Sequence, residues 1–391
     1  MKTIIKITST IIVAIFIHFM TSCNDKDEPL DQPTIASRTI LVYMVSNNTL
    51  GAYGYDSNDL AEMVQASLNS DFNGGRLIIY HAPYNNIPTL YEISNGKVTL
   101  LKEYDLSALS VDAQRMQEVI NDTKRIAPAN SYGLILWSHA NGWLQTGITN
   151  KANTPTDFTN TLNKNYLAFG EDQGKHMNIT SLAQVINDEN FDFIYCDCCY
   201  MGSIEVAYEL RNATPYIIAS ATEIPADGMP YDYNLPLLFE DTTNFKKVCA
   251  TTYDLYNCKH SIDRSCTISL IDTQYLEQLA QLTAQIYKNK EPIPHGFKPQ
   301  QFTLDANCYF YDFAQYIEAI STNHPQLYEE WENALNDAVI YKASTPYMWN
   351  QLKLEYHCGL STYILKDSTD YTTKGYNQLQ WWSDVVCNLY N

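Results

Sequence analysis

Two residues suited to nucleophilic chemistry stand at the ends of apolar runs in this chain. Cys199 lies in the segment Asp197–Gly202 after one run, and His139 lies in Ser138–Trp143 after another. In α/β proteins ligands bind at the carboxyl ends of parallel strands, so a His and a Cys that each end a strand are expected to share one site. A thiol beside an imidazole base can attack a carbonyl carbon. The pattern therefore predicts a cysteine peptidase.

The thiol that acts as the nucleophile is predicted to be Cys199. A free thiol is mostly protonated at neutral pH, so catalysis needs a base such as His139 to take its proton. Side chains alternate along the strand expected at 193–199, which places Cys199 on the same face as Asp197 and Cys198 on the opposite face. The helix that follows, from residue 202 or 203, would direct its positive end toward the thiolate and offer free N–H groups to an oxyanion.

Other interpretations remain open on the residues alone. A His and a Cys at strand ends are often only core residues. The group Cys196, Cys198 and Cys199 would be a candidate metal site, but Cys-x-x-Cys spacing is absent and alternation points the side chains apart, so we expect no metal ion here. A serine hydrolase that uses Ser138 with a different His would need a Gly-x-Ser-x-Gly elbow, which the chain lacks.

The order of apolar and amphipathic segments predicts an α/β fold with a doubly wound, mostly parallel sheet flanked by helices. Strands are expected at 38–45, 76–81, 133–138, 193–198 and 216–221, and helices at 57–68, 113–126, 180–187 and 203–211. Asn95-Gly96 predicts a hairpin between 89–93 and 98–101. A packed C-terminal extension is expected to contain helices at 248–256, 273–288 and 379–390 and strands at 266–271 and 359–365.

The polar segment 146–178, between the His and Cys strands, is expected to be a loop. It is rich in Asn, Thr, Asp and Lys and lacks the apolar periodicity of an element that packs on a core. Apart from one His, its basic residues are Lys151, Lys164 and Lys175.

The N-terminus carries features of an exported protein. Two lysines precede an apolar stretch over residues 11–20, which is shorter than the roughly 20 residues that span a bilayer. A signal peptide is therefore predicted, and the small residues before Cys23 resemble a bacterial lipobox. Lipidation of Cys23 would anchor the protein to a membrane, and simple secretion is the alternative. The expected divisions are a signal peptide at 1–22, a lipid-anchored polar tether at 23–37, and a peptidase domain at 38–391 with its catalytic core at about 38–240 and its C-terminal part at about 241–391.

Net charge and cysteine count limit the partners. The formal net charge is −19, and removal of residues 1–22 would make it −21 because they hold two lysines and no acids. A field of this sign opposes nucleic acid and favours cationic substrates. Nine cysteines lie beyond Cys23, and because that number is odd, at least one thiol stays unpaired in an oxidising compartment, as a nucleophile requires.

The chain also resembles the clostripain family, within the caspase-like clan that contains gingipains, legumains and separases. The matching segments are Thr39–Met44 with Asn47–Leu50, Leu136–His139, Phe169–Gly170, Phe191–Asn234, Tyr311–Ala314 and Gly359–Tyr363. They span nearly the whole mature chain, and the block Asp197–Pro230 is the most specific of them. The resemblance implies a caspase-like fold and a cysteine endopeptidase.

The resemblance assigns the dyad by position. His139 corresponds to the catalytic His of a His-Gly motif, and Cys199 to the nucleophile of Asp-Ala-Cys-Leu-Met-Gly. Ala140 stands where the family has Gly, which keeps an N–H for the oxyanion but adds a methyl group. Cys198 replaces the usual Ala and puts a second thiol beside the nucleophile, where it could oxidise with a neighbour.

The resemblance also implies cleavage after Arg or Lys. The acids that receive this side chain correspond to Asp197 and Asp227, and Glu223 is a neighbouring acid able to replace either. A desolvated guanidinium or ammonium needs such a carboxylate partner. The expected partners are therefore proteins or peptides with Arg or Lys before the cut bond.

Further expectations concern regulation and place. Relatives are processed between the His and the Cys, so we expect self-cleavage after Lys151, Lys164 or Lys175, first of all Lys151, with the fragments staying together. The sequence requires no cofactor, although calcium activates some relatives. The expected location is the bacterial cell envelope, lipid-anchored at the outer membrane or cell surface. The rival hypothesis is a catalytically weak caspase-like surface lipoprotein that binds basic peptides or glycans.

Overall fold

The computed structural model describes residues 34–145, 168–305, 308–365 and 375–387, which belong to one compact unit that begins at Thr34. Among these residues, nine strands form the central sheet. They are β1 (Thr39–Val45), β2 (Arg76–Ala82), β3 (Thr89–Ser94), β4 (Lys97–Glu103), β5 (Tyr132–Trp137), β8 (Phe193–Asp197), β9 (Tyr216–Ala219), β10 (Thr267–Asp272) and β12 (Val339–Ser344).

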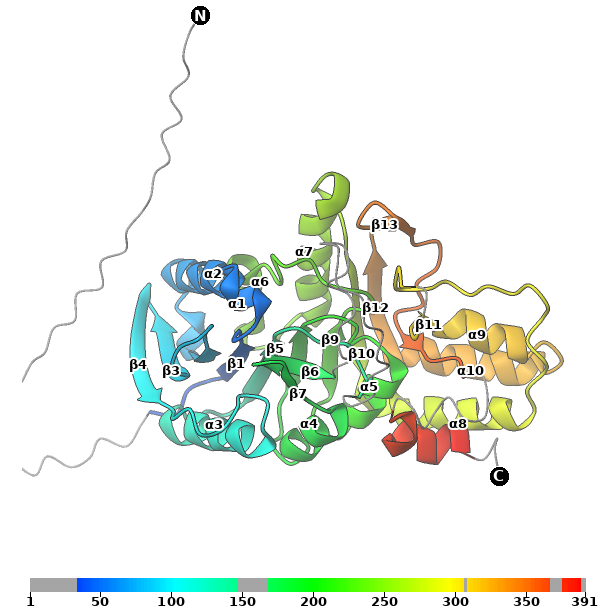
Figure 1. Ribbon diagram of the computed structural model, residues 1–391, viewed down its shortest axis with the longest axis horizontal. Coiled ribbons are helices and arrows are strands. Elements are labelled where there is room, and N and C mark those ends of the chain that lie inside the picture. The colour runs from blue at the N-terminus through cyan, green and yellow to red at the C-terminus, as the bar shows by residue number, and fades with distance from the viewer. Residues whose placement is uncertain (1–33, 146–167, 306–307, 366–374, 388–391) are drawn as a thin grey trace, which may run out of the picture. The chain divides into compact units, whose positions relative to one another are not determined.

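The strand order in this sheet is β12-β10-β9-β8-β5-β1-β2-β3-β4 (Figure 1). The central run from β9 to β2 is parallel, and antiparallel strands extend the sheet on both sides. The predicted α/β class with a mostly parallel sheet is confirmed. The chain builds outward from β1 in both directions, and such a reversal of strand order is where α/β proteins bind ligands.

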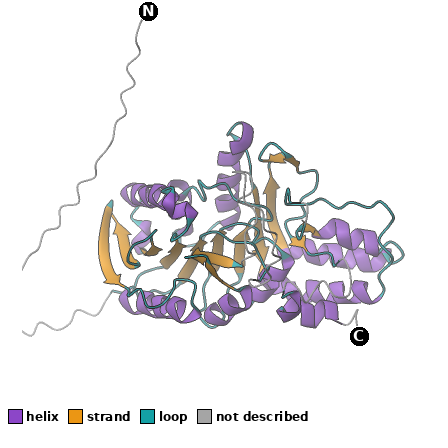
Figure 2. Ribbon diagram, viewed as in Figure 1, coloured by secondary structure: helices purple, strands orange, loops and turns teal. Residues whose placement is uncertain are grey.

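Helices cover both faces of the sheet (Figures 1 and 2). Helices α2 (Tyr55–Asn69), α6 (Tyr231–Leu238) and α7 (Phe245–Asn257) share a core with one face. The opposite face packs on α3 (Ala113–Ile126), α4 (Ile179–Ile186), α5 (Ile204–Leu210), α8 (Leu276–Lys288), α9 (Phe313–Ile320) and α10 (Pro325–Ala338). Strand β1 is apolar along its length because both of its faces are buried. Within the described part of the chain, no helix has the length and apolar character needed to cross a bilayer.

Short strand pairs lie outside the main sheet. They are β6 (Phe169–Asp172) with β7 (Lys175–Met177), β11 (Tyr311–Asp312) with β15 (Ser361–Thr362), and β13 (Tyr347–Met348) with β14 (Leu352–Lys353). The predicted hairpin at Asn95-Gly96 is confirmed as β3–β4, and both turn residues have the positive φ, 50° and 72°, that a two-residue hairpin turn requires.

The polar segment before α4 differs from the prediction. Residues 168–177 are not a plain loop, because Phe169 and Met177 are buried and the turn at Gln173-Gly174 takes positive φ values of 52° and 71°, which allow the β6–β7 hairpin.

The C-terminal elements also differ from the prediction. The strand expected at 359–365 shortens to β15, because the Tyr363 N–H donates to the Glu205 carboxylate at 2.8 Å instead of to a strand. The closing helix covers residues 380–387 of the described chain and contains a π-helical turn at Trp382–Val386, and the Gln380 N–H at its start is bonded to Glu209.

Candidate active site

Sheet register brings the two predicted dyad residues to one place. In the parallel pair β5–β8, Trp137 lies opposite Asp197. His139 and Cys199 each follow this pair by two residues, so both leave the sheet at its carboxyl edge. Both line one cavity of about 310 Å³. The structure therefore places a base and a thiol in a single site at the carboxyl ends of the strands.

The two adjacent thiols differ in environment. The side chain of Cys199 is partly exposed, and the Ile224 N–H donates to its Sγ at 3.3 Å, which stabilises negative charge on the sulfur. Cys198 is 2% exposed and packs in the same core as Cys196 of β8, which Cys199 also contacts. Because β8 ends at Asp197, the predicted alternation does not extend to the two cysteines, and their difference is one of burial. Burial raises the pKa of the Cys198 thiol well above its usual value, so this thiol stays protonated and unreactive.

The ring of His139 has an orienting partner on the loop after β1. The Oγ1 atom of Thr49 lies 2.8 Å from His139 Nε2. Thr49 is the first residue of the short helix α1 (Thr49–Ala52), whose cap is Asn48, with Oδ1 accepting from the Leu50 N–H at 2.8 Å. A hydrogen-bond partner on one ring nitrogen sets the orientation of the imidazole and leaves the other nitrogen to accept or donate a proton.

The backbone beside His139 is held by the β6–β7 hairpin. The Gly170 N–H donates to the His139 carbonyl at 2.9 Å, and the Asn141 N–H donates to the Ala168 carbonyl at 3.2 Å. These bonds enclose the antiparallel bridge of Ala140 with Phe169. In such a pair the enclosed N–H groups point away from the partner strand, so the Ala140 N–H is directed away from the hairpin. Ala140 lines the cavity, as an oxyanion donor must.

The N–H groups expected at the start of the next helix are placed differently. The Tyr200 N–H donates to the Thr222 carbonyl at 2.9 Å, and the Gly202 N–H donates to the Ser220 carbonyl at 2.7 Å. These bonds fasten the segment after Cys199 to the segment after β9, so neither group is free for an oxyanion. Helix α5 itself begins later, at Ile204.

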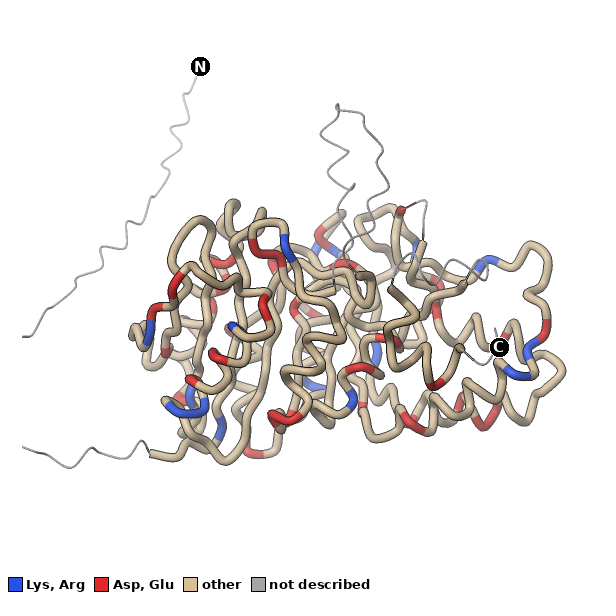
Figure 3. The backbone as a smooth tube through the Cα atoms, turned by 60° about the horizontal axis from the view of Figure 1, so that its bottom comes forward, with Lys and Arg blue, Asp and Glu red and all other residues tan. Residues whose placement is uncertain are grey.

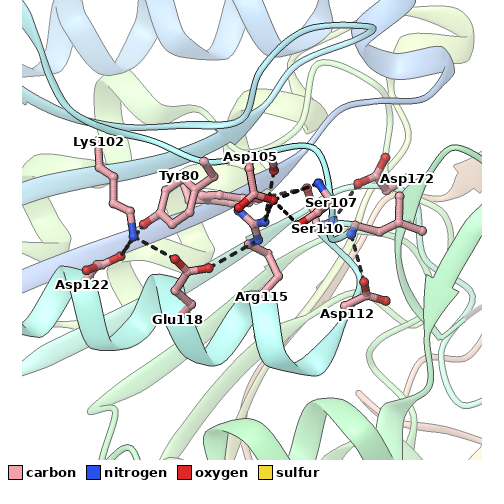
Figure 4. A network of polar contacts seen from close by, with 12 residues as sticks. Tyr80, Lys102, Asp105, Ser107, Ser110, Asp112, Arg115, Glu118, Asp122 and Asp172 are labelled. Carbon is pink, nitrogen blue, oxygen red and sulfur yellow. Dashed lines mark hydrogen bonds and ion pairs between the residues drawn. The ribbon is translucent and has the colours of Figure 1, made fainter.

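A network of polar contacts joins the β6–β7 hairpin, through Asp172, to neighbouring segments (Figure 4). Asp172 of β6 accepts the Ser110 N–H at 2.7 Å and the Asn47 Nδ2–H at 2.8 Å. Ser110 also bonds the Tyr80 hydroxyl through its Oγ at 3.0 Å, and Arg115 of α3 forms an ion pair with Asp105 at 3.2 Å (Figure 4). The hairpin is thus joined to the loop after β1 and to the start of α3, and the loop that carries His139 is held on both sides.

Asp197 is one of the residues that line the cavity. It is 6% exposed, and its Oδ2 accepts the Met229 N–H at 3.0 Å and the Tyr231 hydroxyl at 2.9 Å. Burial raises the pKa of Asp197, and these two hydrogen bonds oppose the rise. Gly228 packs directly on the carboxylate: its φ is 62°, and a Cβ there would lie 2.8 Å from Asp197 Oδ2.

Two further acids, which the sequence did not single out, approach Asp197 from α2. Asp59 is 1% exposed and accepts the Trp137 Nε1–H at 2.5 Å, and its pKa is raised by burial and by the charge of Asp197. Glu62 accepts the Tyr231 N–H at 3.1 Å, and burial raises its pKa to about 7. Helical spacing in the sequence could have indicated that Asp59 is buried, because it is four residues before Met63 and lies on the same buried face of α2.

The structure does not bring Asp227 into the cavity. Its side chain is 65% exposed and forms an ion pair with Lys259 Nζ at 2.8 Å. The neighbours Ala226 and Gly228 line the cavity, but Asp227 is turned to the other side of this loop. Glu223 of the same loop lines the cavity instead. Local sequence could not show which of these carboxylates faces inward.

The remaining predicted residues lie elsewhere. Lys175 is exposed on β7, whereas Lys151, Lys164 and Cys23 lie outside the described residues. Within the described ranges, no group of three or more His, Cys, Asp or Glu side chains is placed to hold a metal ion.

Comparison with known proteins identifies the family. The model of the clostripain family matches residues 42–384 of this chain. The chain belongs to the clostripain family. This clostripain-type cysteine endopeptidase is 29% identical to an inactive zymogen C11 protease from Parabacteroides distasonis, with 90% of this chain and 99% of that chain covered and a TM-score of 0.75. It is 28% identical to a secreted C11 cysteine protease from Bacteroides thetaiotaomicron in complex with an irreversible peptide inhibitor, with the same coverage and a TM-score of 0.76.

One further structure supports the fold alone, and the search of curated proteins found no match. A secreted C11 cysteine protease from Bacteroides thetaiotaomicron called iotapain, 23% identical, covers 90% of this chain and 100% of its own, with a TM-score of 0.77. No curated protein matches the sequence of this clostripain-family chain. The caspase-like fold and the class of enzyme that the sequence predicted are both confirmed.

Proposed function

We propose that this clostripain-family peptidase cleaves peptide bonds after Arg or Lys through a dyad of Cys199 and His139. The observation that carries the proposal is one cavity that holds a part-exposed thiol, an oriented imidazole and the buried carboxylate of Asp197. A cationic side chain that leaves water is stabilised by such a carboxylate, and a neutral side chain is not.

The residues support a two-step hydrolysis. The Nε2 atom of His139 faces Thr49, so Nδ1 takes the proton of the Cys199 thiol as the sulfur attacks the carbonyl carbon. The Ala140 N–H stabilises the oxyanion, the C–N bond breaks, and His139 returns the proton to the leaving amine. Water, deprotonated by His139, then attacks the thioester, which releases the acid product and restores the thiol.

Specificity in this proposal comes mainly from Asp197. Asp227 takes part only when its carboxylate exchanges Lys259 for the substrate cation, and an exposed ion pair of this kind contributes only about 0–1 kcal/mol. Acidic residues outnumber basic ones along the chain (Figure 3), so the field around the site also attracts cationic peptides.

Hydrolysis of a fluorogenic peptide that ends in Arg or Lys tests the proposal, with a peptide that ends in Ala as the control. Cys199→Ala should abolish turnover and labelling by a basic chloromethyl ketone, whereas Cys198→Ala should keep most activity. An inactive Cys198→Ala beside an active Cys199→Ala would reverse the assignment. An unreactive wild type that still binds basic peptides would favour the binding lipoprotein instead.

The proposal includes self-processing after Lys151. The β6–β7 hairpin follows the segment 146–167 and is bonded beside His139, so a cut within that segment would leave the site intact. Lys175 is less suited, because its backbone is paired in β7. One relative is described as an inactive zymogen. Mass spectrometry should find a cut wild type and an uncut Cys199→Ala; identical cutting in both would refute self-processing.

Export and lipidation also belong to the proposal. One similar C11 protease is described as secreted, and the lipobox at Cys23 adds an anchor to the cell envelope, at the outer membrane or cell surface. Activation by calcium, which the family resemblance implies for some relatives, is a separate point of the proposal. Activity with and without a chelator tests that point.

A further inference from the structure

A second cavity of about 220 Å³ opens beside the catalytic one. The two cavities have four lining residues in common: Tyr200, Glu223, Asp305 and Trp349. A peptide whose cut bond lies at Cys199 can therefore extend a neighbouring side chain into the second cavity, because consecutive residues of an extended chain advance by only about 3.3 Å.

Buried apolar side chains form part of the wall of the second cavity. Phe302 and Met348 are buried at its side. The ring of Tyr200 stacks on Phe310, with centroids 4.6 Å apart and an angle of 12° between the planes. Such walls suit the methylene stem of a long side chain, which can be buried while its charged head stays at a polar rim.

The rim shared by the two cavities is acidic. Glu223 accepts the Trp349 Nε1–H at 2.5 Å. Glu223 and Asp305 line both cavities together with Tyr200, whose pKa is raised by burial and by the charges of these two carboxylates. As far as the chain is described, neither cavity is lined by a Lys or an Arg.

Trp349 is fixed at the rim by a strained turn. It and Asn350 form the tip of the β13–β14 hairpin, with φ values of 53° and 55°, and its N–H donates to Ser265 Oγ at 2.7 Å. Non-glycine residues in this conformation cluster at ligand sites, because the surrounding structure must maintain the strain. A cation bound here can contact the face of the indole ring and the negative charge of the neighbouring carboxylate.

We propose that the second cavity is a subsite for a second cationic side chain of the substrate. The preferred peptides carry one basic residue before the cut bond and another nearby, whose stem lies between Phe302 and Met348 and whose head meets Glu223, Asp305 and the Trp349 indole. This inference rests on the proposed cleavage after Arg or Lys and names the substrate class more closely.

The test uses fluorogenic peptides with Arg fixed before the cut bond. A second Arg, or its neutral isostere citrulline, is moved through the four positions before that Arg and the two positions after the cut. One position should raise kcat/KM about tenfold with Arg over citrulline. Asp305→Asn should lower that ratio, whereas Glu330→Gln on the exposed face of α10 should leave it unchanged.

General attraction to the acidic protein predicts a different result. It would favour Arg at every position, ignore Asp305→Asn and vanish with salt, and that outcome would overturn the subsite. If no Arg peptide is cut at all, the proposed function fails separately. Binding of the Arg and citrulline peptides to the Cys199→Ala variant, measured by fluorescence anisotropy, then decides the subsite: equal affinities refute it, and tighter Arg binding at one position supports it.

Discussion

Thr49→Val removes the hydroxyl that lies 2.8 Å from His139 Nε2 and keeps the branched shape of the side chain. The Asn48 cap of α1 does not depend on this hydroxyl, because its own Oδ1 accepts the Leu50 N–H at 2.8 Å. The variant therefore removes the support of the imidazole and leaves the local backbone in place.

The size of the effect follows from the charge on the ring. Once His139 has taken the thiol proton, Nε2–H donates to Thr49 Oγ1, and a hydrogen bond from a charged group contributes about 1.5–3 kcal/mol when buried. Thr49 is exposed, so water replaces much of this contribution, and we expect a cost of about 1 kcal/mol. This cost corresponds to a loss of about fivefold in kcat. KM should change little, because the hydroxyl supports the base and not the substrate.

The assay measures kcat and KM separately on one Arg-ended fluorogenic peptide, with melting temperatures as a check on folding. Thr49→Ser keeps the hydroxyl and should retain most of the rate. A Thr49→Val enzyme with the wild-type kcat would refute the orienting role. A loss in Thr49→Ser as large as that in Thr49→Val would also contradict the orienting role, because Ser keeps the hydroxyl, and a loss in Thr49→Ser alone would assign the effect to the methyl group.

Three further predictions concern charge, stability and location. Asp197→Asn should weaken kcat/KM for Arg and Lys peptides by the equivalent of roughly 2–5 kcal/mol, and unchanged cleavage of basic substrates would exclude the acidic pocket. Burial raises the pKa of Glu209 from 4.5 to about 7. The contribution of Glu209 to the free energy of unfolding should therefore be fully present below about pH 4.5, and up to about 3 kcal/mol of it should be lost as the pH rises through 7. In urea titrations, Glu209→Gln should remove this part of the fall; an identical pH dependence in both proteins would contradict it. Cys23→Ala should release the protein from the membrane fraction, and continued association would point to another anchor.

The sequence by itself determined most of the central strands and helices and the family. Helix 113–126 and the hairpin at Asn95-Gly96 follow from local periodicity and turn chemistry, which need no distant contact. Alternation along the strand predicted opposite faces for Cys198 and Cys199, but β8 ends at Asp197, and both cysteines border the cavity and pack against the same core. Burial is what separates them, since Cys198 is buried and Cys199 is partly exposed. The resemblance of the Asp197–Pro230 block to clostripains supplied the family before any geometry was known.

Only the tertiary structure decided the surroundings of the dyad. Thr49 on α1, Asp59 on α2 and Trp349 after β13 are all far in sequence from His139 and Cys199. Their approach to the site depends on strand order and helix packing, which local patterns do not encode. The outward turn of Asp227 depends on Lys259, which lies on the segment after α7. The sequence does not distinguish one loop carboxylate from another. A carboxylate that pairs with a cation outside the cavity, as Asp227 does, no longer faces the substrate, so the packing of neighbouring segments decides which acids line the cavity.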